Sequence, residues 1–353
     1  MRTVSGRVLS GSSDSLRPVA GQVVVLHRIS ADSSGPVDSV RTTATGTYRF
    51  RYRLESPRSM YIVSSRYAGI AYFTTPLREA TVTSPDADIS VFDTTSAAFP
   101  LTVRARHVVV APAEANGFRR VVDVFEVAND SNRTLIAGPG GMTWRVALPA
   151  EAREPGSSGG DLPPDAFRFS AGSAELVVPF PPGSRQLVLT YAIPARGAVA
   201  IPVPDAVTSL EVLVEGSVGR VSGAGLSAED PVSMEGRTFQ RFTASPVAAG
   251  TSFIVASGGA GRNAGRVALL ALAAVAVALG IVVGRRSPSR AAVVPATVPA
   301  TESLAREIAA LDHVYASPAR AGDAGGAYYR ERRSTLMARL IEAQAVEDRG
   351  TTT

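Results

Sequence analysis

The sequence predicts a mainly β protein built from two tandem β-sandwich domains, one transmembrane helix and a C-terminal α-helical hairpin. Three observations lead to this fold class. Short apolar runs alternate with glycine and proline turns over the first 256 residues, which is typical of strands. A long uncharged apolar run follows at 267–284, and apolar residues then recur at helical spacing over 303–348.

The composition limits the classes of function. The 353 residues suffice for two or three domains, and a hydrophobic content of 45% argues against wholesale disorder. The net charge of +5 comes from arginine alone, because the sequence contains no lysine. The arginines lie singly among acids rather than in a dense basic block, so we expect no nucleic-acid partner. The absence of cysteine excludes disulfides, thiolate metal sites and thiol catalysis.

Residues 1–92 predict the first sandwich. A strand opens at Val4, Gly6 and Val8, and turn residues separate it from the strands that follow. Further strands are expected at Gln22–Ile29, Gly46–Leu54, Met60–Ser65 and Ala68–Phe73.

Four segments of this domain resemble, in order, the carboxypeptidase regulatory-like domain, a transthyretin-like or Ig-like sandwich of bacterial surface proteins. They are SGRVL, PVAGQVVVLHRI, TTATGTYRFRY and MYIVSSRYAGIAYF. The family's hairpin glycine matches Gly46, although the usual acidic residue before it is Thr45 here. The resemblance covers about a quarter of the chain. It implies a structural or adhesive module without peptidase activity.

Residues 93–256 predict a second sandwich of antiparallel strands separated by glycine and proline turns. The stretch Glu151–Pro164 is interpreted as a flexible loop within it. The segments EVANDSNRT and TWRVALP resemble parts of uncharacterised bacterial envelope proteins. The seven expected strands are Leu101–Val110, Val121–Asn129, Met142–Leu148, Ala174–Pro179, Gln186–Ile193, Leu210–Glu215 and Ser252–Ala256.

The run VALLALAAVAVALGIVVG at 267–284 would span roughly 27 Å as a helix. A buried helix of a soluble domain is the alternative, but such helices rarely lack a polar face throughout. A glycine-rich hinge (257–266) precedes the run and a Pro/Ala linker (285–302) follows it. The flanking arginines weakly favour a cytoplasmic tail, with two before the run and three after it: Arg262, Arg266, Arg285, Arg286 and Arg290.

These features predict a location at the bacterial inner (cytoplasmic) membrane, with the β domains outside and the tail inside. The opening MRTVSGRVLS has no signal-peptide pattern. We therefore expect an upstream extension or a processed N-terminus, with the reverse topology as the alternative.

The tail at 303–348 predicts two amphipathic helices in a hairpin. Ser303 can cap the first helix, whose apolar face is Leu304, Ile308, Leu311 and Tyr315. The second helix is expected from Ala327 to Val346, with an apolar side made of Tyr329, Leu336, Met337, Leu340 and Ile341.

The strings LAREIAALDHVY and YYRERRSTLMARLIEA resemble the C-terminal helical pair of bacterial membrane proteins, some of them encoded among cytochrome c maturation factors. They are also similar to short oligomerisation hairpins of the SHOCT type. The chain departs from the first pattern by inserting Ser317–Ala327. A generic amphipathic hairpin is the alternative interpretation.

Two motifs imitate active sites. Gly156–Gly160 satisfies the GxSxG pattern of a hydrolase, with Ser158 at the nucleophile position, but prolines surround it and no strand-to-helix turn is expected there. Gly259–Ala264 satisfies a relaxed GxGxxA, but the helix after it is the apolar run, so a juxtamembrane hinge is the better interpretation.

Metal ligands are not predicted either. His27 and His107 are isolated, each within a strand, and we interpret them as hydrogen-bonded sheet histidines. Asp86 and Asp88 lack the glycine and terminal glutamate of a calcium loop and are interpreted as a surface turn.

The sequence therefore predicts a non-catalytic, single-pass envelope protein that binds or scaffolds a partner. We expect no catalytic, cofactor-binding or metal-ligating residues and no cofactor. The expected partners are the lipid bilayer and either another protein or a second copy, held through the tail. One alternative is an accessory factor for cytochrome c or other envelope assembly. Another is an enzyme with an unrecognised site in the second sandwich.

Overall fold

The computed structural model describes two parts of the chain. The first is residues 1–256, without 14, 31–34, 57–58, 98, 100, 171, 216–219 and 235. The second is residues 301, 304–305, 307–309, 311 and 331–343. The fold is mainly β, as predicted. The chain divides into two compact units, one formed by 1–95, 131–134 and 297–353 and the other by 96–130 and 135–296.

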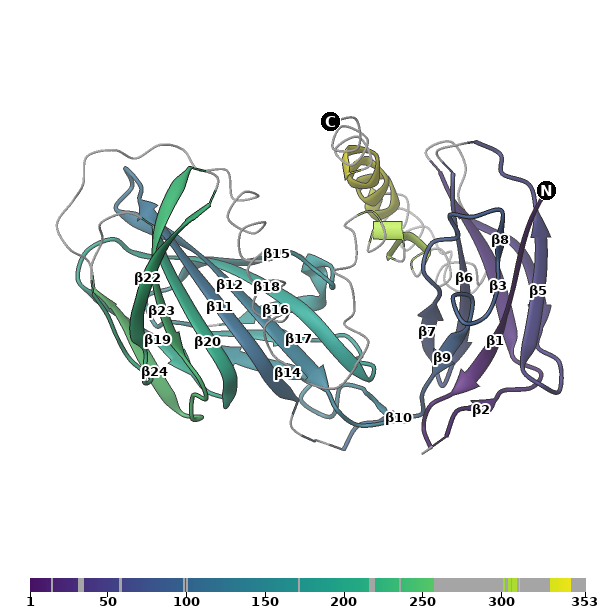
Figure 1. Cartoon of the computed structure of the whole chain (residues 1–353), viewed down its shortest axis with the longest axis horizontal. Coiled ribbons are helices and arrows are strands. Elements are labelled where there is room, and N and C mark those ends of the chain that lie inside the picture. Colours follow the sequence, from purple (N-terminus) through teal and green to yellow (C-terminus); the bar gives the residue numbers. More distant parts are fainter. Residues whose placement is uncertain are drawn as a thin grey trace. The chain divides into compact units, whose positions relative to one another are not determined.

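The first unit contains two sheets (Figure 1). In one sheet, β1 (Arg2–Ser10) lies between β2 (Arg17–Pro18) and β5 (Thr47–Tyr52) and also pairs in parallel with β8 (Thr81–Val82) and β9 (Ile89–Val91). The other sheet has the order β4-β3-β6-β7, with the bounds Gly35–Arg41, Val23–Ile29, Met60–Tyr67 and Ile70–Phe73. The short strands β10 (Thr94–Thr95) and β13 (Thr134–Leu135) pair with each other.

Alternation along the strands explains why these two sheets pack face to face. In β5 the side chains of Tyr48, Phe50 and Tyr52 are buried, whereas those between them are exposed arginines. Val24 and Leu26 of β3 join the same core from the opposite sheet. Such period-two burial places one apolar face of each sheet against the other and forms a sandwich.

The second unit is built around a seven-stranded sheet of order β15-β18-β12-β11-β20-β23-β22. All neighbours in it are antiparallel except β11 and β20, which are parallel. In chain order these strands are β11 (Thr102–Ala113), β12 (Phe118–Asn129), β15 (Arg153–Gly160), β18 (Gly183–Pro194), β20 (Val207–Glu215), β22 (Ser227–Met234) and β23 (Arg237–Ala244).

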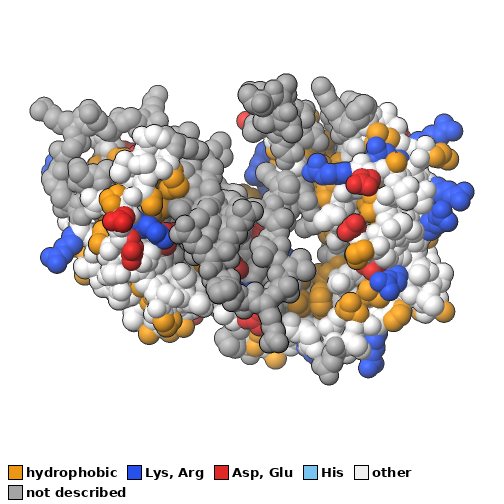
Figure 2. Space-filling model, viewed as in Figure 1, with side chains coloured by type: hydrophobic (Ala, Val, Ile, Leu, Met, Phe, Trp, Pro, Cys, Tyr) orange, Lys and Arg blue, Asp and Glu red, His pale blue; other side chains and the backbone are white. Residues whose placement is uncertain are grey.

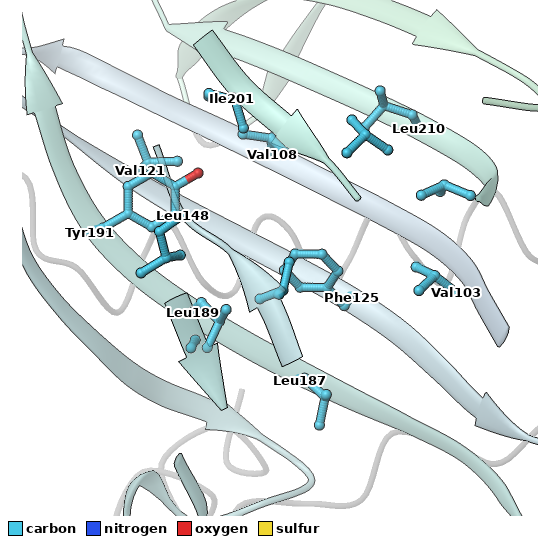
Figure 3. Close-up of a cluster of buried hydrophobic side chains, with 14 of the residues drawn as sticks. Val103, Val108, Val121, Phe125, Leu148, Leu187, Leu189, Tyr191, Ile201 and Leu210 are labelled. Atoms are coloured by element: carbon cyan, nitrogen blue, oxygen red, sulfur yellow. The ribbon is translucent and has the colours of Figure 1, made fainter. Parts of the chain in front are cut away.

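Two three-stranded sheets form the second layer of this unit, in the orders β14-β17-β16 and β19-β24-β21. Figure 3 shows part of the apolar core, with Ile201 of the small sheet beside Val108 of the large one, and Phe125 and Leu189 of the large sheet in the same cluster. The bounds of these strands are β14 (Trp144–Ala147), β16 (Phe167–Ser170), β17 (Ser173–Leu176), β19 (Ala198–Val203), β21 (Arg220–Gly223) and β24 (Thr251–Ala256), and a 3-10 turn spans Pro164–Ala166.

Two expectations for the second unit are wrong. The stretch 151–164 is not a loop throughout, because β15 occupies Arg153–Gly160 and pairs with β18. Backbone hydrogen bonds recruit this polar, glycine-rich segment as an edge strand, with irregular register, although it has no apolar alternation. The sheet is also not purely antiparallel, since β11 and β20 run side by side in the same direction.

The predicted fold class is wrong in its helical part. No helix within the described residues is long and apolar enough to cross a membrane, and the predicted span at 267–284 lies outside those residues. The described part of the tail is helical over 331–343 and at positions between 301 and 311, but it does not stand as a separate hairpin. It belongs to the first unit, which is therefore discontinuous in sequence. The apolar stripes of the tail cover a sheet, which explains this difference.

Candidate functional site

The candidate site is the outer face of sheet β4-β3-β6-β7, the face turned away from the sandwich core. Val24 and Leu26 point into that core, so Ile29, three residues beyond Leu26 in β3, lies on the opposite face. In β6, likewise, Tyr61 and Val63 belong to the core. Ile62, between them, is fully buried on the outer side. An outer face that carries fully buried isoleucines must be covered.

Helical residues of the tail share a buried apolar cluster with this face. Ile29 and Ile62 contribute from the sheet, and Met60 and Phe73 pack at its margin. The helical members fall into two groups: Leu304, Ala305, Ile308 and Ala309, and Leu336, Met337 and Leu340. The spacing of three and four residues in each group is that of one helix face. We call this set of sheet and tail residues the docking cluster.

Neighbouring positions of the second helical segment show how selective the burial is. Leu336 and Leu340 are 0% and 1% exposed, whereas Ile341 is 48% exposed. The sequence placed Ile341 on the same apolar side as Leu340, and the structure turns it outward. The docking cluster therefore uses a narrow stripe of the helix.

Polar contacts accompany the docking cluster. Arg332 Nη2 donates to Glu307 Oε1 at 2.7 Å, which joins the two helical segments. In the sheet, His27 Nε2 lies 2.7 Å from Ser64 Oγ, and both side chains are buried. His27 is thus hydrogen bonded within its sheet, beside the position of Ile62 in the register.

A buried ion pair in the second unit is the polar cluster that would most resemble an active site. Arg106 donates to both carboxylate oxygens of Asp123, at 2.9 and 2.7 Å, and Tyr191 donates to the same carboxylate at 3.1 Å. Arg106 also donates to the carbonyl of Pro202, and its guanidinium lies 4.8 Å from the ring centre of Phe125. These contacts join the large sheet to β19 in the second layer.

The environment of this ion pair indicates a structural rather than a catalytic role. Burial lowers the pKa of Arg106, but Asp123 outweighs it and the net shift is upward. Burial and the neighbouring Asp123 raise the pKa of Tyr191 well above its ordinary value. Both groups therefore keep their protons, and neither Arg106 nor Asp123 is more than 1% exposed. Because the pair is buried between the layers and bridges them, we assign it a role in holding the two layers together.

A second polar group lies on β11 and its neighbours, one residue further along. Glu211 lies between His107, whose Nδ1 is 3.0 Å away, and Arg241, whose Nε donates at 2.6 Å. Burial would raise the pKa of Glu211, but the hydrogen bonds from His107 and Arg241 lower it overall. The register places Val124 and Glu211 beside His107, so its strand neighbours supply no hydroxyl that it could activate.

The motifs that imitate active sites do not assemble one in the described residues. Ser157 and Ser158 lie in the edge strand β15, where the Ser157 hydroxyl donates to the carbonyl of Val188 at 2.8 Å. A nucleophile elbow needs a sharp strand-to-helix turn, which β15 does not provide. The GxGxxA segment at 259–264 lies outside the described residues.

The acidic turn is occupied by an internal contact. Asp88 accepts hydrogen bonds from the backbone and side chain of Arg7 and from Ser84. Burial raises the pKa of Asp88 but these donors outweigh it, so the pKa is lowered. Within the part of the chain that the structure describes, no three His, Asp or Glu side chains are placed to hold a metal ion.

Sequence reasoning recognised both halves of the docking cluster but not their contact. Ile29 and Ile62 lay in predicted strands, and Leu304 and Ile308 in a predicted helix. The available signal was the unbroken apolar run in QVVVLHRI and MYIV, because a strand with one face exposed would alternate. That signal indicates that both faces of the sheet are buried, but it does not identify the segment that packs on the outer face.

Comparison with known proteins adds little to this description. No protein-family model matches the chain, and no curated protein matches it. Among solved structures, a variant of a two-domain M1 zinc metallopeptidase bound to L-arginine is similar at 16% identity and a TM-score of 0.29. The match covers 44% of this chain and 42% of that protein. So low a TM-score carries no argument about fold or function.

Proposed function

We propose that the chain is a non-catalytic binding or scaffolding protein, and that its first unit holds amphipathic helices on the outer face of sheet β4-β3-β6-β7. The observation that carries the proposal is the docking cluster. Ile29, Ile62 and Leu340 are at most 1% exposed, although Leu340 lies 278 residues after Ile62 and 311 after Ile29 in the sequence. Each such side chain contributes roughly 1.5–3 kcal/mol when it leaves water.

The resemblance of the first unit to carboxypeptidase regulatory-like domains agrees with this role and stays a prediction, as does that of the tail to helical pairs of membrane proteins. Location in the bacterial envelope and contact with a lipid bilayer also stay predictions, since they rest on the apolar run 267–284, its flanking arginines and the resemblance of the β domains. Binding by the sheet face does not depend on either.

Limited trypsin digestion of the full chain tests whether the sheet holds the tail. Leu336→Asp with Leu340→Asp places two charges in the docking cluster and should expose the tail to cleavage after Arg339. Ile341→Asp is the control for each single substitution, because this exposed neighbour takes the same Leu/Ile-to-Asp charge outside the cluster. Ile62→Asp should release the tail without altering it, and Ile62→Ala gives a milder form if the charge unfolds the sandwich.

Binding in trans provides the second arm. A labelled peptide covering 301–349 should bind the full chain that carries Leu336→Asp and Leu340→Asp, because its docking face is vacated. It should bind more weakly when Ile62→Ala is added. A tail that stays protected in both Ile62 variants would show that the sheet face does not hold it, and the proposed function would fail.

A further inference from the structure

We infer that the outer face of edge strand β5 binds a linear phosphodiester polymer through three arginines, contacting its phosphates and not its bases. The surface lies on the opposite sheet from the docking cluster, so the inference does not rest on the proposed helix binding. Its central observation is a row of arginines at every second position, Arg49, Arg51 and Arg53.

Alternation places Arg49 and Arg51 on the outer side of β5, and Arg53 follows directly after the strand ends. Tyr48, Phe50 and Tyr52 fill the core, so Arg49 and Arg51 point outward and are exposed. Arg53, the first residue after β5, is also exposed, and its carbonyl accepts a hydrogen bond from the Tyr61 hydroxyl at 2.9 Å. A rise of about 3.4 Å per residue separates successive arginines by roughly 7 Å. Figure 2 shows arginine side chains gathered along the side of the first unit where β5 runs in Figure 1.

These charges are uncompensated within the described residues. No described carboxylate forms an ion pair with Arg49, Arg51 or Arg53, whereas Arg7 on the adjacent strand is neutralised by Asp88 at 2.7 Å. Arg104, Arg168 and Arg237 are likewise paired, with Asp130, Glu175 and Glu215. A guanidinium fork without a carboxylate is free to bind a phosphate in the same bidentate way.

The shape of the charged surface favours a linear partner over a planar one. Opposite Arg51 and Arg49 in the register stand Thr3 and Ser5 of β1, which are uncharged. The charge is therefore a single row rather than a two-dimensional patch, and β5 pairs with β1 and no other described strand. An anionic membrane would be matched by charges spread over the face, with apolar anchors among them.

Base recognition is not expected on this surface. Single-stranded nucleic acids are held by stacking on exposed aromatic rings. The aromatic residues of β5 are all buried, which leaves only phosphate contacts. Arginines that are separated by aromatic residues in the sequence thus form a row because alternate side chains of a strand point to the same side.

Fluorescence anisotropy of the full chain with a labelled abasic deoxyribose-phosphate oligomer tests the inference. At about 16 units it reaches the upper site size of small single-strand binding folds. Three phosphate contacts predict a log–log salt slope near −2, so a fourfold rise in salt should weaken binding about 16-fold. The variant Arg49→Gln/Arg51→Gln/Arg53→Gln should lose this dependence, and each single substitution should reduce the slope by about 0.7.

The matched control removes the same charge elsewhere. Arg104→Gln/Arg145→Gln/Arg168→Gln changes three exposed arginines that pair with Asp130 or Glu175, and should keep the wild-type slope. Replacing the β5 arginines by lysine should retain the slope, which also separates charge from folding if the glutamine variant is unstable.

Three results would overturn the inference. One is a control variant that loses as much affinity as the β5 variant, which would make net charge the cause. Another is oligothymidylate of equal length binding far more tightly than the abasic oligomer, which would mean that bases are read. The third is vesicles of anionic lipid competing as well as the oligomer at equal phosphate concentration, which would make the partner a membrane.

Discussion

Asp123 accepts two hydrogen bonds from the guanidinium of Arg106, at 2.9 and 2.7 Å, and neither side chain is more than 1% exposed. The pair connects β11 to β12 in the large sheet, and Arg106 reaches on to Pro202 in the second layer. Two charges are thus sealed between apolar layers, where each depends on the other.

Removing one partner of this pair should be far more harmful than removing both. Asp123→Asn leaves the Arg106 charge buried without its counterion and should cost about 3–5 kcal/mol in urea unfolding. Arg106→Met with Asp123→Leu should cost less than Asp123→Asn alone. The control is Asp130→Asn, which opens the exposed pair with Arg104 and should cost at most about 1 kcal/mol. A double variant as unstable as the sum of its singles would contradict this account.

Glu211 should make the protein less stable as the pH is lowered. The hydrogen bonds from His107 and Arg241 lower its pKa in the folded state. A carboxyl of lowered pKa contributes stability above its unfolded pKa of about 4.3, and the contribution is lost as pH falls through the folded pKa. Glu211→Gln should therefore destabilise at pH 7, by roughly 1–3 kcal/mol, and the gap to the wild type should shrink at low pH.

Chemical denaturation at pH 7 and at pH 3 would measure that gap. Glu126, exposed on β12, provides a control substitution on the same sheet, since Glu126→Gln removes a charge without breaking a buried contact. A gap that widens on acidification would mean that the lowered pKa of Glu211 is not the cause.

Alanine substitutions at Gly46 and Gly69 should distinguish the cost of backbone strain from the cost of steric crowding. Gly46 and Gly69 have φ of +72° and +83°, so alanine at either should cost about 1–2 kcal/mol from conformation alone. A Cβ at Gly69 would meet nothing within 4 Å, whereas at Gly46 it would lie 2.8 Å from the carbonyl oxygen of Val8. Gly46→Ala should therefore lower the free energy of unfolding by at least about 1 kcal/mol more than Gly69→Ala. Equal losses in thermal or urea unfolding would contradict the steric argument.

Apolar burial, rather than the ion pair between Arg332 and Glu307, should hold the tail. Both of these charged groups are partly exposed, so a double-mutant cycle should give a coupling below about 1 kcal/mol. Arg332→Gln should leave the tail protected against protease. If Arg332→Gln lost as much protection as Leu336→Asp with Leu340→Asp, the ion pair rather than apolar burial would hold the tail on the sheet.

Period-two alternation predicts strand positions and inward faces well in this chain. Along GTYRFRYRL it indicates that Tyr48 and Phe50 are buried while Arg49 and Arg51 are exposed, and the structure agrees. The predicted strand at Gln22–Ile29 corresponds to β3, shifted by one residue at its start. Local periodicity suffices here because each side chain's environment follows from its own strand.

Features that depend on contacts between distant segments were missed. The edge strand β15 has no apolar alternation, since only its backbone joins the sheet. The parallel pairing of β11 and β20 leaves no local trace in either strand. The cover of Ile29 and Ile62 comes from the far end of the chain, and a sequence pattern shows that a face is apolar without identifying what packs on it.

The parallel pairing of β11 and β20 sets an order of events during synthesis. His107 and Glu211, which meet across these strands, are 104 residues apart, so β11 leaves the ribosome long before its partner exists. Until then β11 has one open edge in what becomes the middle of a sheet, a template on which another nascent chain could form a strand. A fragment that ends at residue 206 keeps that edge permanently, and we expect it to aggregate where the whole unit does not.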